Sequence, residues 1–467
     1  MSLLIWQRTT NNMVRIAAIA AVATSASATT ISESTFRALE THGVVDVLVT
    51  YKAGVGLTTL NTESLPRKAR AQQVFNTLTN ENFAITESAV EVARAAGVKY
   101  TQFWIDSVVA VEGANEELVT KLGALPNVVR VSPVEEYEAP TFDVDIVATN
   151  EWGLEKIGVP AAWARGNKGK GIVVANIDTG VRGTHEALKG NFRALNGWYD
   201  PSTNSLAPTD HKGHGTHTMG TIVGINGIGV APEAQWIACG ACPGKCSQTL
   251  YLKCAQFILC PTDTNGQNPD CSLAPHVVNN SWSTRQNGKT WFEASILAWR
   301  AAGIIPVFSN GNYGPNCSTV GSPSDSPSVI SVGATNKADA LATFSARGPD
   351  PLQQRIKPDV SAPGTMIRSA GSSSDTAYVT KSGTSMAAPH VTGTIALILN
   401  AHPGATYDTV YKMIADTVDT SSLTISTANC GGVDNTKYPN NDYGYGRINA
   451  NKASAPAPTP DPTTTTS

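Results

Sequence analysis

Four short, almost unbroken apolar runs after residue 170 place the strongest limit on the fold of this chain. They cover residues 172–177, 277–278, 304–308 and 329–332. Runs without alternating polar residues are typical of strands that are buried on both faces of a parallel sheet. Helical segments fall between them, including one that begins near His214 and one over residues 385–400. This alternation predicts an α/β domain of three layers with a mostly parallel sheet.

The region before this domain contains none of the eight cysteines and has weaker patterns. Its candidate strands and helices are residues 44–50, a helix opened by Pro66, two short runs within 103–111, a helix capped by Asn115, and residues 128–131. The order β-α-β-β-α-β matches the split ferredoxin-like unit. We therefore expect a ferredoxin-like α+β domain over residues 29–142, followed by the α/β domain over residues 143–452.

The two ends of the chain carry segments that would build no core. Arg15 precedes an apolar stretch over residues 16–23, and residues 26–28 have the small-x-small pattern of an export signal. The stretch is too short for a membrane span, which needs about 20 apolar residues, and a buried N-terminal helix is the alternative reading. We expect a signal peptide over residues 1–28 and a secreted, extracellular protein. Residues 453–467 are rich in Pro and Thr and predict a linker or tail.

All eight cysteines lie after residue 238, and an even number in an exported chain predicts disulfide bonds. The sequence does not choose among their pairings. Cys239 and Cys242 have a spacing that also suits zinc, although export argues against that alternative. The net charge of −3 gives no sign of a basic face for nucleic acid or for an anionic membrane. We expect a monomer without a membrane span.

The first candidate for chemistry is Asp178, which follows the first apolar run directly. Open α/β sheets bind their ligands at the carboxyl ends of the strands. An acidic residue at this point therefore suits a catalytic role. Because aspartate also favours turns, a purely structural role is the alternative.

The second candidate is His214, which lies between two glycines where the chain turns into an apolar helix. The near-neutral pKa of histidine suits a general base, and the glycines allow a close approach of backbone or substrate. His211, His214 and His217 could instead share a helical face and bind a metal. No H-E-x-x-H pattern is present, and the glycines weaken the helix where ligands would have to be rigid. We expect no metal at this position.

The third candidate is Ser385, within residues 383–390. Gly383 and Thr384 would present the serine at the start of a helix, where unpaired N–H groups favour an oxyanion. Pro389 lacks an N–H, so it leaves the carbonyl of Ser385 without its helical partner. A helix whose first turns are specialised in this way favours a nucleophile over a simple N-cap serine.

The three segments together resemble the subtilisin-like serine proteases, or subtilases. The chain order Asp, His, Ser separates that family from the chymotrypsin and α/β-hydrolase orders. The resemblance covers residues 150–452, with further family-like segments at 229–232, 357–364 and 444–450. The region from Ala241 to Asn280 is similar to the bacillopeptidase F-like branch, and residues 29–142 resemble the inhibitor I9-type propeptides of the same family.

The resemblance implies a mechanism. Ser385 would attack the scissile carbonyl, His214 would take its proton, and Asp178 would hold the imidazole. The backbone N–H of Ser385 and the side chain of Asn312 would stabilise the oxyanion. Asn310 is a competing candidate for the second donor.

The resemblance also implies a substrate-binding strand. Residues 278–283 would pair with the backbone of an extended peptide, and Ser281, Trp282, Ser283 and Gly311 are the substrate-binding candidates. Ser283 stands where relatives often have glycine, and Trp282 is bulky, so broad cleavage is the default expectation. No cofactor is expected. The loop over residues 226–229 is shorter than the calcium loop of many relatives, and a calcium site elsewhere is not assigned.

An active serine-type endopeptidase competes with two other readings. A catalytically dead relative would serve as a binding module, but all three triad positions are filled. A lipase or esterase would carry a G-x-S-x-G elbow, whereas Ser385 is followed by Met386 and Ala387. We expect protein or peptide substrates and a zymogen, with the pro-segment as an intramolecular inhibitor that is cut between Glu138 and Asp145.

Overall fold

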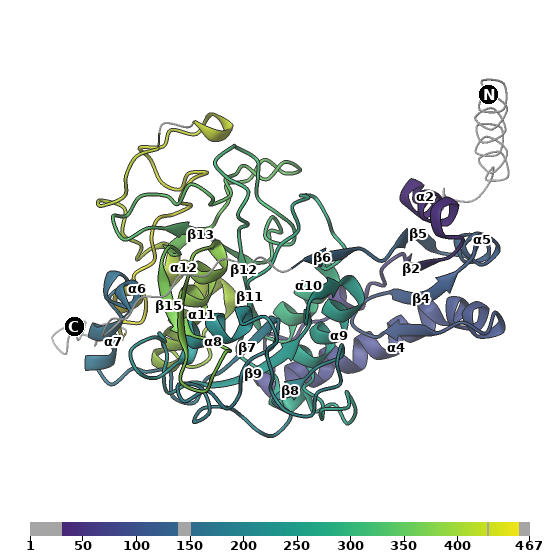
Figure 1. The fold of residues 1–467 in the computed structure, drawn as a ribbon, viewed down its shortest axis with the longest axis horizontal. Coiled ribbons are helices and arrows are strands. Elements are labelled where there is room, and N and C mark those ends of the chain that lie inside the picture. Colours follow the sequence, from purple (N-terminus) through teal and green to yellow (C-terminus); the bar gives the residue numbers. More distant parts are fainter. Residues whose placement is uncertain (1–29, 139–150, 427–428, 457–467) are drawn as a thin grey trace, which may run out of the picture. The chain divides into compact units, whose positions relative to one another are not determined.

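The computed structural model describes residues 30–138, 151–426 and 429–456 (Figure 1). The chain divides into two compact units. The first extends to Gly56 and also includes Leu78–Glu135, and the second comprises Leu57–Thr77 and everything from Glu136 onward. The expected signal peptide lies outside the described residues, as do most of the expected cleavage region and most of the tail.

The first unit contains a five-stranded sheet with the order β1-β5-β2-β4-β3. Its elements are β1 (Thr30–Ile31), α2 (Glu33–His42), β2 (Val45–Tyr51), α4 (Arg67–Ala95) from Leu78 onward, β3 (Tyr100–Phe103), β4 (Val108–Ala114), α5 (Glu116–Gly123) and β5 (Val128–Pro133). The side chain of Asn115 caps α5 by accepting a hydrogen bond from the N–H of Leu118 at 2.9 Å. The expected β-α-β-β-α-β order is present, preceded by β1 and α2.

The second unit is built on a seven-stranded sheet with the order β14-β13-β12-β11-β7-β9-β8. All its neighbouring strands are parallel. The strands are β7 (Val173–Asp178), β8 (Trp198–Tyr199), β9 (Gln235–Gly240), β11 (Val277–Asn280), β12 (Ile305–Ser309), β13 (Ile330–Thr335) and β14 (Val360–Pro363). The four apolar runs form β7, β11, β12 and β13, which confirms the predicted parallel α/β sheet.

Helices cover both faces of this sheet, as two consecutive residues of β12 illustrate. Val307 belongs to the apolar core that also contains Val391 of α11 (Thr384–Ala401). The ring of Phe308 lies 6.4 Å from Phe292, which directly precedes α10 (Glu293–Ala301). Because neighbouring strand residues point to opposite faces, α11 and α10 lie on opposite sides of the sheet. The expected layering is therefore present.

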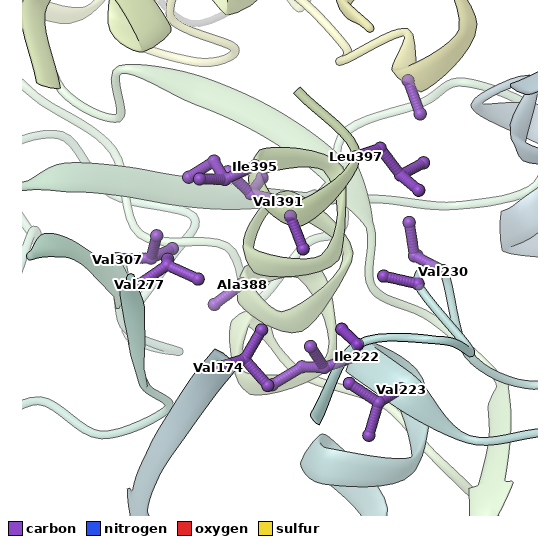
Figure 2. Close-up of a cluster of buried hydrophobic side chains, with 14 of the residues drawn as sticks. Val174, Ile222, Val223, Val230, Val277, Val307, Ala388, Val391, Ile395 and Leu397 are labelled. Carbon is purple, nitrogen blue, oxygen red and sulfur yellow. The ribbon is translucent and has the colours of Figure 1, made fainter. Parts of the chain in front are cut away.

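Figure 2 shows how α11 packs into the core on its face of the sheet. The labelled side chains of α11 meet those of three strands and of α8 (His214–Val223) or the loop after it: Ala388, Val391, Ile395 and Leu397 against Val174, Val277, Val307, Ile222, Val223 and Val230. The approach of α11 is close enough to require a glycine, since a Cβ on Gly393 would lie 2.5 Å from the Cβ of Val230. This packing fixes α8 and α11, whose N-terminal ends carry His214 and Ser385.

The remaining elements are smaller. They are α3 (Gly56–Thr59), β6 (Glu136–Glu138), α6 (Trp152–Lys156), α7 (Val159–Ala164), β10 (Lys245–Ser247), α9 (Gln248–Leu259), a 3₁₀ turn (Cys271–Leu273), β15 (Ile367–Ala370), β16 (Tyr378–Lys381), α12 (Tyr407–Ala415), a second 3₁₀ turn (Cys430–Gly432) and α13 (Ala450–Ala453). None of the helices in the described part of the chain combines the length and apolar character that a bilayer span requires.

The eight cysteines form four disulfide bonds. The pairs are Cys239–Cys254, Cys242–Cys246, Cys260–Cys271 and Cys317–Cys430. This confirms that the cysteines form disulfides and supplies the pairing that the sequence left open. Because every cysteine is bonded to another, none offers the thiolate that a zinc site at Cys239 and Cys242 would need.

Candidate active site

One cleft of about 310 Å³ in the second unit brings all the predicted site residues together. Its lining includes Asp178, His214 and Ser385, with Asn312, Ser281, Trp282, Ser283 and Gly311. These side chains come from the carboxyl end of β7, the first residue of α8, the first turn of α11, and the loops that follow β11 and β12. The cleft therefore lies at the carboxyl ends of the parallel strands, where open α/β sheets place their sites.

Asp178 and His214 form a buried pair at one side of the cleft. His214 Nδ1 lies 2.8 Å from Asp178 Oδ1, and their side chains are 8% and 4% exposed. The N–H of Thr179 donates to the same carboxylate at 2.7 Å, and the hydroxyl of Thr218 donates to it at 3.2 Å. A carboxylate so placed accepts the Nδ1–H of the imidazole. The other ring nitrogen, Nε2, then carries the lone pair that a general base needs.

The start of α8 is held against the end of β7 by a glycine. A Cβ on Gly215 would collide with the carbonyl oxygen of Gly180 and lie 2.9 Å from the Cβ of Asp178. The N–H of Gly215 also donates to the hydroxyl of Thr179 at 2.9 Å. The glycine after His214 therefore gives this helix end the close approach that brings its imidazole to the aspartate.

A second aspartate, Asp210, organises the turn that leads into α8. Its carboxylate accepts the N–H of Gly213 at 2.8 Å and the N–H of Thr216 at 2.8 Å. It also accepts the hydroxyl of Thr179 at 2.9 Å. These bonds satisfy N–H groups at the helix N-terminus and tie them to the residue after Asp178. Asp210 thus supports both members of the aspartate–histidine pair without lining the cleft.

Ser385 is held by a reciprocal contact with Ser281. The hydroxyl of Ser385 donates to the carbonyl of Ser281 at 3.1 Å, and the hydroxyl of Ser281 donates to the carbonyl of Ser385 at 2.8 Å. The second bond supplies a donor to the carbonyl of Ser385, which has no partner within α11 because the proline four residues later lacks an N–H. Ser281, which is 1% exposed, therefore uses its side chain to position the serine.

Asn312 has its carboxamide oxygen engaged by the start of α11. The oxygen accepts the N–H of Thr384 at 2.9 Å and the hydroxyl of Thr384 at 2.9 Å. With Oδ1 committed, Nδ2 is the end of the amide that can donate to a group in the cleft. Asn310, the alternative candidate, is fully buried. Its amide donates to the carbonyl of Ala346 at 2.6 Å and accepts from Ser331 at 2.8 Å. The geometry favours Asn312 as the donor.

Aromatic rings form another part of the cleft wall. Tyr251 and Trp282 stack with their ring centroids 4.0 Å apart, and the hydroxyl of Tyr313 donates to the carbonyl of Ser283 at 3.1 Å. Burial raises the pKa of both tyrosines, so both are neutral phenols at neutral pH. These rings therefore give this part of the cleft wall an uncharged, aromatic surface.

The metal alternative gains no support from the histidines. His217 Nε2 lies 2.9 Å from the carbonyl of Ile367, and burial, helped by the charge of Lys381, lowers the pKa of His217 to about 3. Its imidazole is therefore a neutral group bound to the backbone. Within the described ranges, no group of three or more His, Cys, Asp or Glu side chains is arranged to hold a metal ion.

An extended segment of the chain itself runs along the cleft. Strand β6 pairs antiparallel with β10, with Tyr137 opposite Cys246. Tyr137, Cys242 and Cys246 all line the cleft. The edge of β10 therefore accepts a strand in the manner of peptide β-augmentation. Neither β10 nor its disulfide is among the predicted site features, because a three-residue strand has no periodicity to detect.

Two supporting roles also lie outside the predictions from the sequence. Ser281 is a predicted substrate-binding residue, and the hydrogen bond from its hydroxyl to the carbonyl of Ser385 is an additional finding. Asp210 is not among the predicted residues. A signal existed for each. Pro389 predicts that the carbonyl of Ser385 needs another donor, and an aspartate a few residues before a helix is a frequent capping group.

A parallel α/β sheet with a carboxylate, an imidazole and a hydroxyl along one cleft has the arrangement of a serine hydrolase. A model of the subtilase family matches residues 169–446. Bacillopeptidase F of Bacillus subtilis (strain 168) is 37% identical over 373 residues, which are 72% of this chain and 25% of that protein. Minor extracellular protease Epr of the same organism is 33% identical over 310 residues, or 63% of this chain and 43% of that protein.

Subtilisin E, also of Bacillus subtilis (strain 168), is 33% identical over 258 residues, which are 54% of this chain and 61% of that protein. The chain thus spans less than two thirds of the length of each of these three relatives. The family match covers more than half of the chain. The chain belongs to the subtilase family, the subtilisin-like serine proteases, and the expected resemblance to the family is confirmed.

Proposed function

We propose that this chain is a secreted serine endopeptidase that is made as a self-inhibited zymogen. Asp178, His214 and Ser385 would be its catalytic triad. The observation that carries the proposal is the 2.8 Å contact between His214 Nδ1 and Asp178 Oδ1 in the cleft that Ser385 and Asn312 also line. The membership of the subtilase family supports the same activity.

The first chemical step requires a rotation of the Ser385 hydroxyl. The hydroxyl now donates to the carbonyl of Ser281, and it would have to leave this acceptor in order to donate to Nε2 of His214. His214 would take the proton while the serine oxygen attacks the scissile carbonyl. Asp178 would keep the imidazole in the useful tautomer and stabilise the imidazolium. The proton then passes to the leaving amine, and water releases the acyl group by the same route.

The developing oxyanion needs preorganised donors about 2.7–3.1 Å away. The Nδ2 of Asn312 is one proposed donor, since the other end of that amide is bound to Thr384. The backbone N–H of Ser385, in the first turn of α11, is the other. The positive end of the helix dipole favours negative charge at the same place.

Peptide substrates would bind as an additional strand on β10. The pairing of β6 with β10 supports both this binding mode and self-inhibition, because the segment occupies the edge that a substrate would use. Residues 29–142 would be the inhibitor I9-like pro-segment, and the chain would cut itself between Glu138 and Asp145. Secretion is supported by the four disulfides, which are typical of exported proteins.

The proposal is tested by expressing a Ser385→Ala precursor beside the wild type and beside Ser382→Ala. The hydroxyl of Ser382 accepts the N–H of Met366, which makes this serine a matched control outside the cleft lining. Peptide hydrolysis should fall about 10⁶-fold in kcat for Ser385→Ala and persist for Ser382→Ala. N-terminal sequencing should find the Ser385→Ala precursor uncut. Unaided maturation of that variant at the normal rate would exclude self-processing.

A further inference from the structure

Strand β10 has one partner strand among the described residues. It forms a two-stranded sheet with β6 and does not join the seven-stranded sheet of the same unit. Its register places Lys245, Cys246 and Ser247 opposite Glu138, Tyr137 and Glu136. If β6 leaves on maturation, or a substrate has not yet bound, no ladder of hydrogen bonds holds β10 in its extended form. Something else must then keep it in place.

The Cys242–Cys246 disulfide lies at this position. Cys246 is the middle residue of β10, and its partner is four residues earlier, with the two Cα atoms 4.4 Å apart. Both cysteines are nearly fully buried and both line the cleft. The bond closes a ring over Pro243, Gly244 and Lys245, so a covalent bond fixes both the turn before β10 and the first residue of the strand. At the other end of β10, Ser247 caps α9 by accepting the N–H of Leu250.

The same ring begins beside the catalytic aspartate. Gly240, the last residue of β9, pairs with Asp178, and the N–H of Ala241 donates to the carbonyl of Asp178 at 2.8 Å. Cys242 is the next residue. The disulfide therefore links the backbone that supports Asp178 to the strand on which a peptide would lie, and fixes the distance between the two.

We propose that the Cys242–Cys246 disulfide is a positioning element for substrate. It would hold β10 extended before binding, so that the residues on the amino side of the scissile bond meet a preformed edge. This inference rests on the proposed peptidase function. Binding to a preformed edge avoids the cost of ordering the strand at the moment of association. The bond would consequently act on the binding of long peptides and leave the chemistry at Ser385 unchanged.

The test is a Cys242→Ser/Cys246→Ser double variant of the full chain, matured and assayed beside the wild type. One substrate is a peptide with four residues before the scissile bond, and the other is an N-acetyl amino-acid ester that cannot reach β10. For the long peptide, KM should rise about tenfold with kcat changed less than about twofold. For the ester, both constants should match those of the wild type. Equal constants for the long peptide in variant and wild type would overturn the inference.

A Cys260→Ser/Cys271→Ser double variant is the matched control, because that disulfide also spans a short loop, with a separation of 11 residues, and does not line the cleft. Its KM for the long peptide should be unchanged, and a tenfold rise there would overturn the inference. The single variants Cys242→Ser and Cys246→Ser should each reproduce the full effect of the double variant, since either breaks the same bond. Additive effects would instead assign the change to separate side-chain contacts.

A variant with two glycines inserted after Pro243 keeps the disulfide but enlarges its ring. This variant tests the positioning role if the double variant does not mature. It should show the same rise of KM for the long peptide. An unchanged KM in this variant would contradict the positioning role. A wild-type chain that hydrolyses neither substrate would refute the proposed function itself. An active wild type, with disulfide variants whose KM for the long peptide equals that of the wild type, would refute the role of the disulfide alone.

Discussion

The carboxamide oxygen of Asn312 accepts the backbone N–H of Thr384 at 2.9 Å. Thr384 is the first residue of α11 and directly precedes Ser385. The proposed oxyanion donor and the proposed nucleophile are therefore tied together by one contact, and the direction in which the amide donates is set by the helix that carries the serine. The two groups that must act on one carbonyl are placed by the same element.

This relationship predicts the effect of Asn312→Leu, which removes the Nδ2 donor together with the Oδ1 acceptor that Thr384 uses. Loss of one oxyanion-hole donor costs about 10²–10³ in kcat, with KM nearly unchanged, because the bond strengthens in the transition state. Steady-state kinetics on a chromogenic peptide measures both constants. A variant with raised KM and undiminished kcat would show that Asn312 binds the ground state and not the oxyanion.

Ser281→Ala should weaken the start of α11. The variant removes the hydroxyl that donates to the carbonyl of Ser385, and Pro389 cannot supply a replacement. A buried acceptor left without a partner costs about 1–3 kcal/mol. The free energy of unfolding in urea should fall by that amount, measured in the Ser385→Ala background to avoid self-digestion. Ser281→Thr keeps the hydroxyl and should lose less; equal losses would assign the effect to packing.

Gly215→Ala should separate His214 from Asp178. A Cβ at this position would press on Gly180 and on Asp178 itself, so α8 would have to move away from the end of β7. We expect kcat/KM to fall by at least about 10²-fold, since a misplacement of the catalytic groups by about 1 Å can reduce the rate by that factor. Gly190→Ala is the control, because a Cβ there would meet no atom within 4 Å. Full activity in Gly215→Ala would contradict the close-approach argument.

His390 should make the fold sensitive to acid. Burial lowers the pKa of His390 to about 4, whereas an unfolded histidine has a pKa near 6.5. The folded state therefore binds fewer protons between these values. The stability that depends on neutral His390 is present above pH 6.5 and is lost as the pH falls through about 4.

The shift corresponds to about 3 kcal/mol between pH 7 and pH 4. Urea unfolding of Ser385→Ala, with and without His390→Gln, measures it. In the variant without the histidine, the free energy of unfolding should fall less over this pH range. The slope of that free energy against pH should be smaller by the equivalent of up to one bound proton per molecule. Identical slopes for the two proteins would show that His390 is not held neutral in the folded state.

The sequence predicted the parts of this molecule that local patterns encode. A strand buried on both faces shows as an unbroken apolar run, so β7 and the position of Asp178 at its end could be read directly. The glycines beside His214 and the proline after Ser385 are backbone requirements, which is why the two helix starts were found. The gathering of these side chains in one cleft follows from the parallel order of the strands.

The sequence could not predict contacts that depend on tertiary arrangement. The pairing of Cys242 with Cys246 needs the turn of the chain after β9. Ser281 is predicted as a substrate-binding residue from the resemblance of its strand, but nothing in its own segment predicts that its hydroxyl donates to the carbonyl of Ser385, 104 residues later. Strand β1 was missed because two residues carry no periodicity, and it exists through its pairing with β5.

The central claim is that His214 makes the hydroxyl of Ser385 reactive, and covalent labelling with a serine-directed phosphonate tests it most directly. Mass spectrometry of the matured wild type should locate one phosphonyl adduct on Ser385. His214→Ala should label more slowly by several orders of magnitude, and Ser385→Ala should not label there at all. An adduct on another serine, or labelling of Ser385 at the wild-type rate in His214→Ala, would contradict the account.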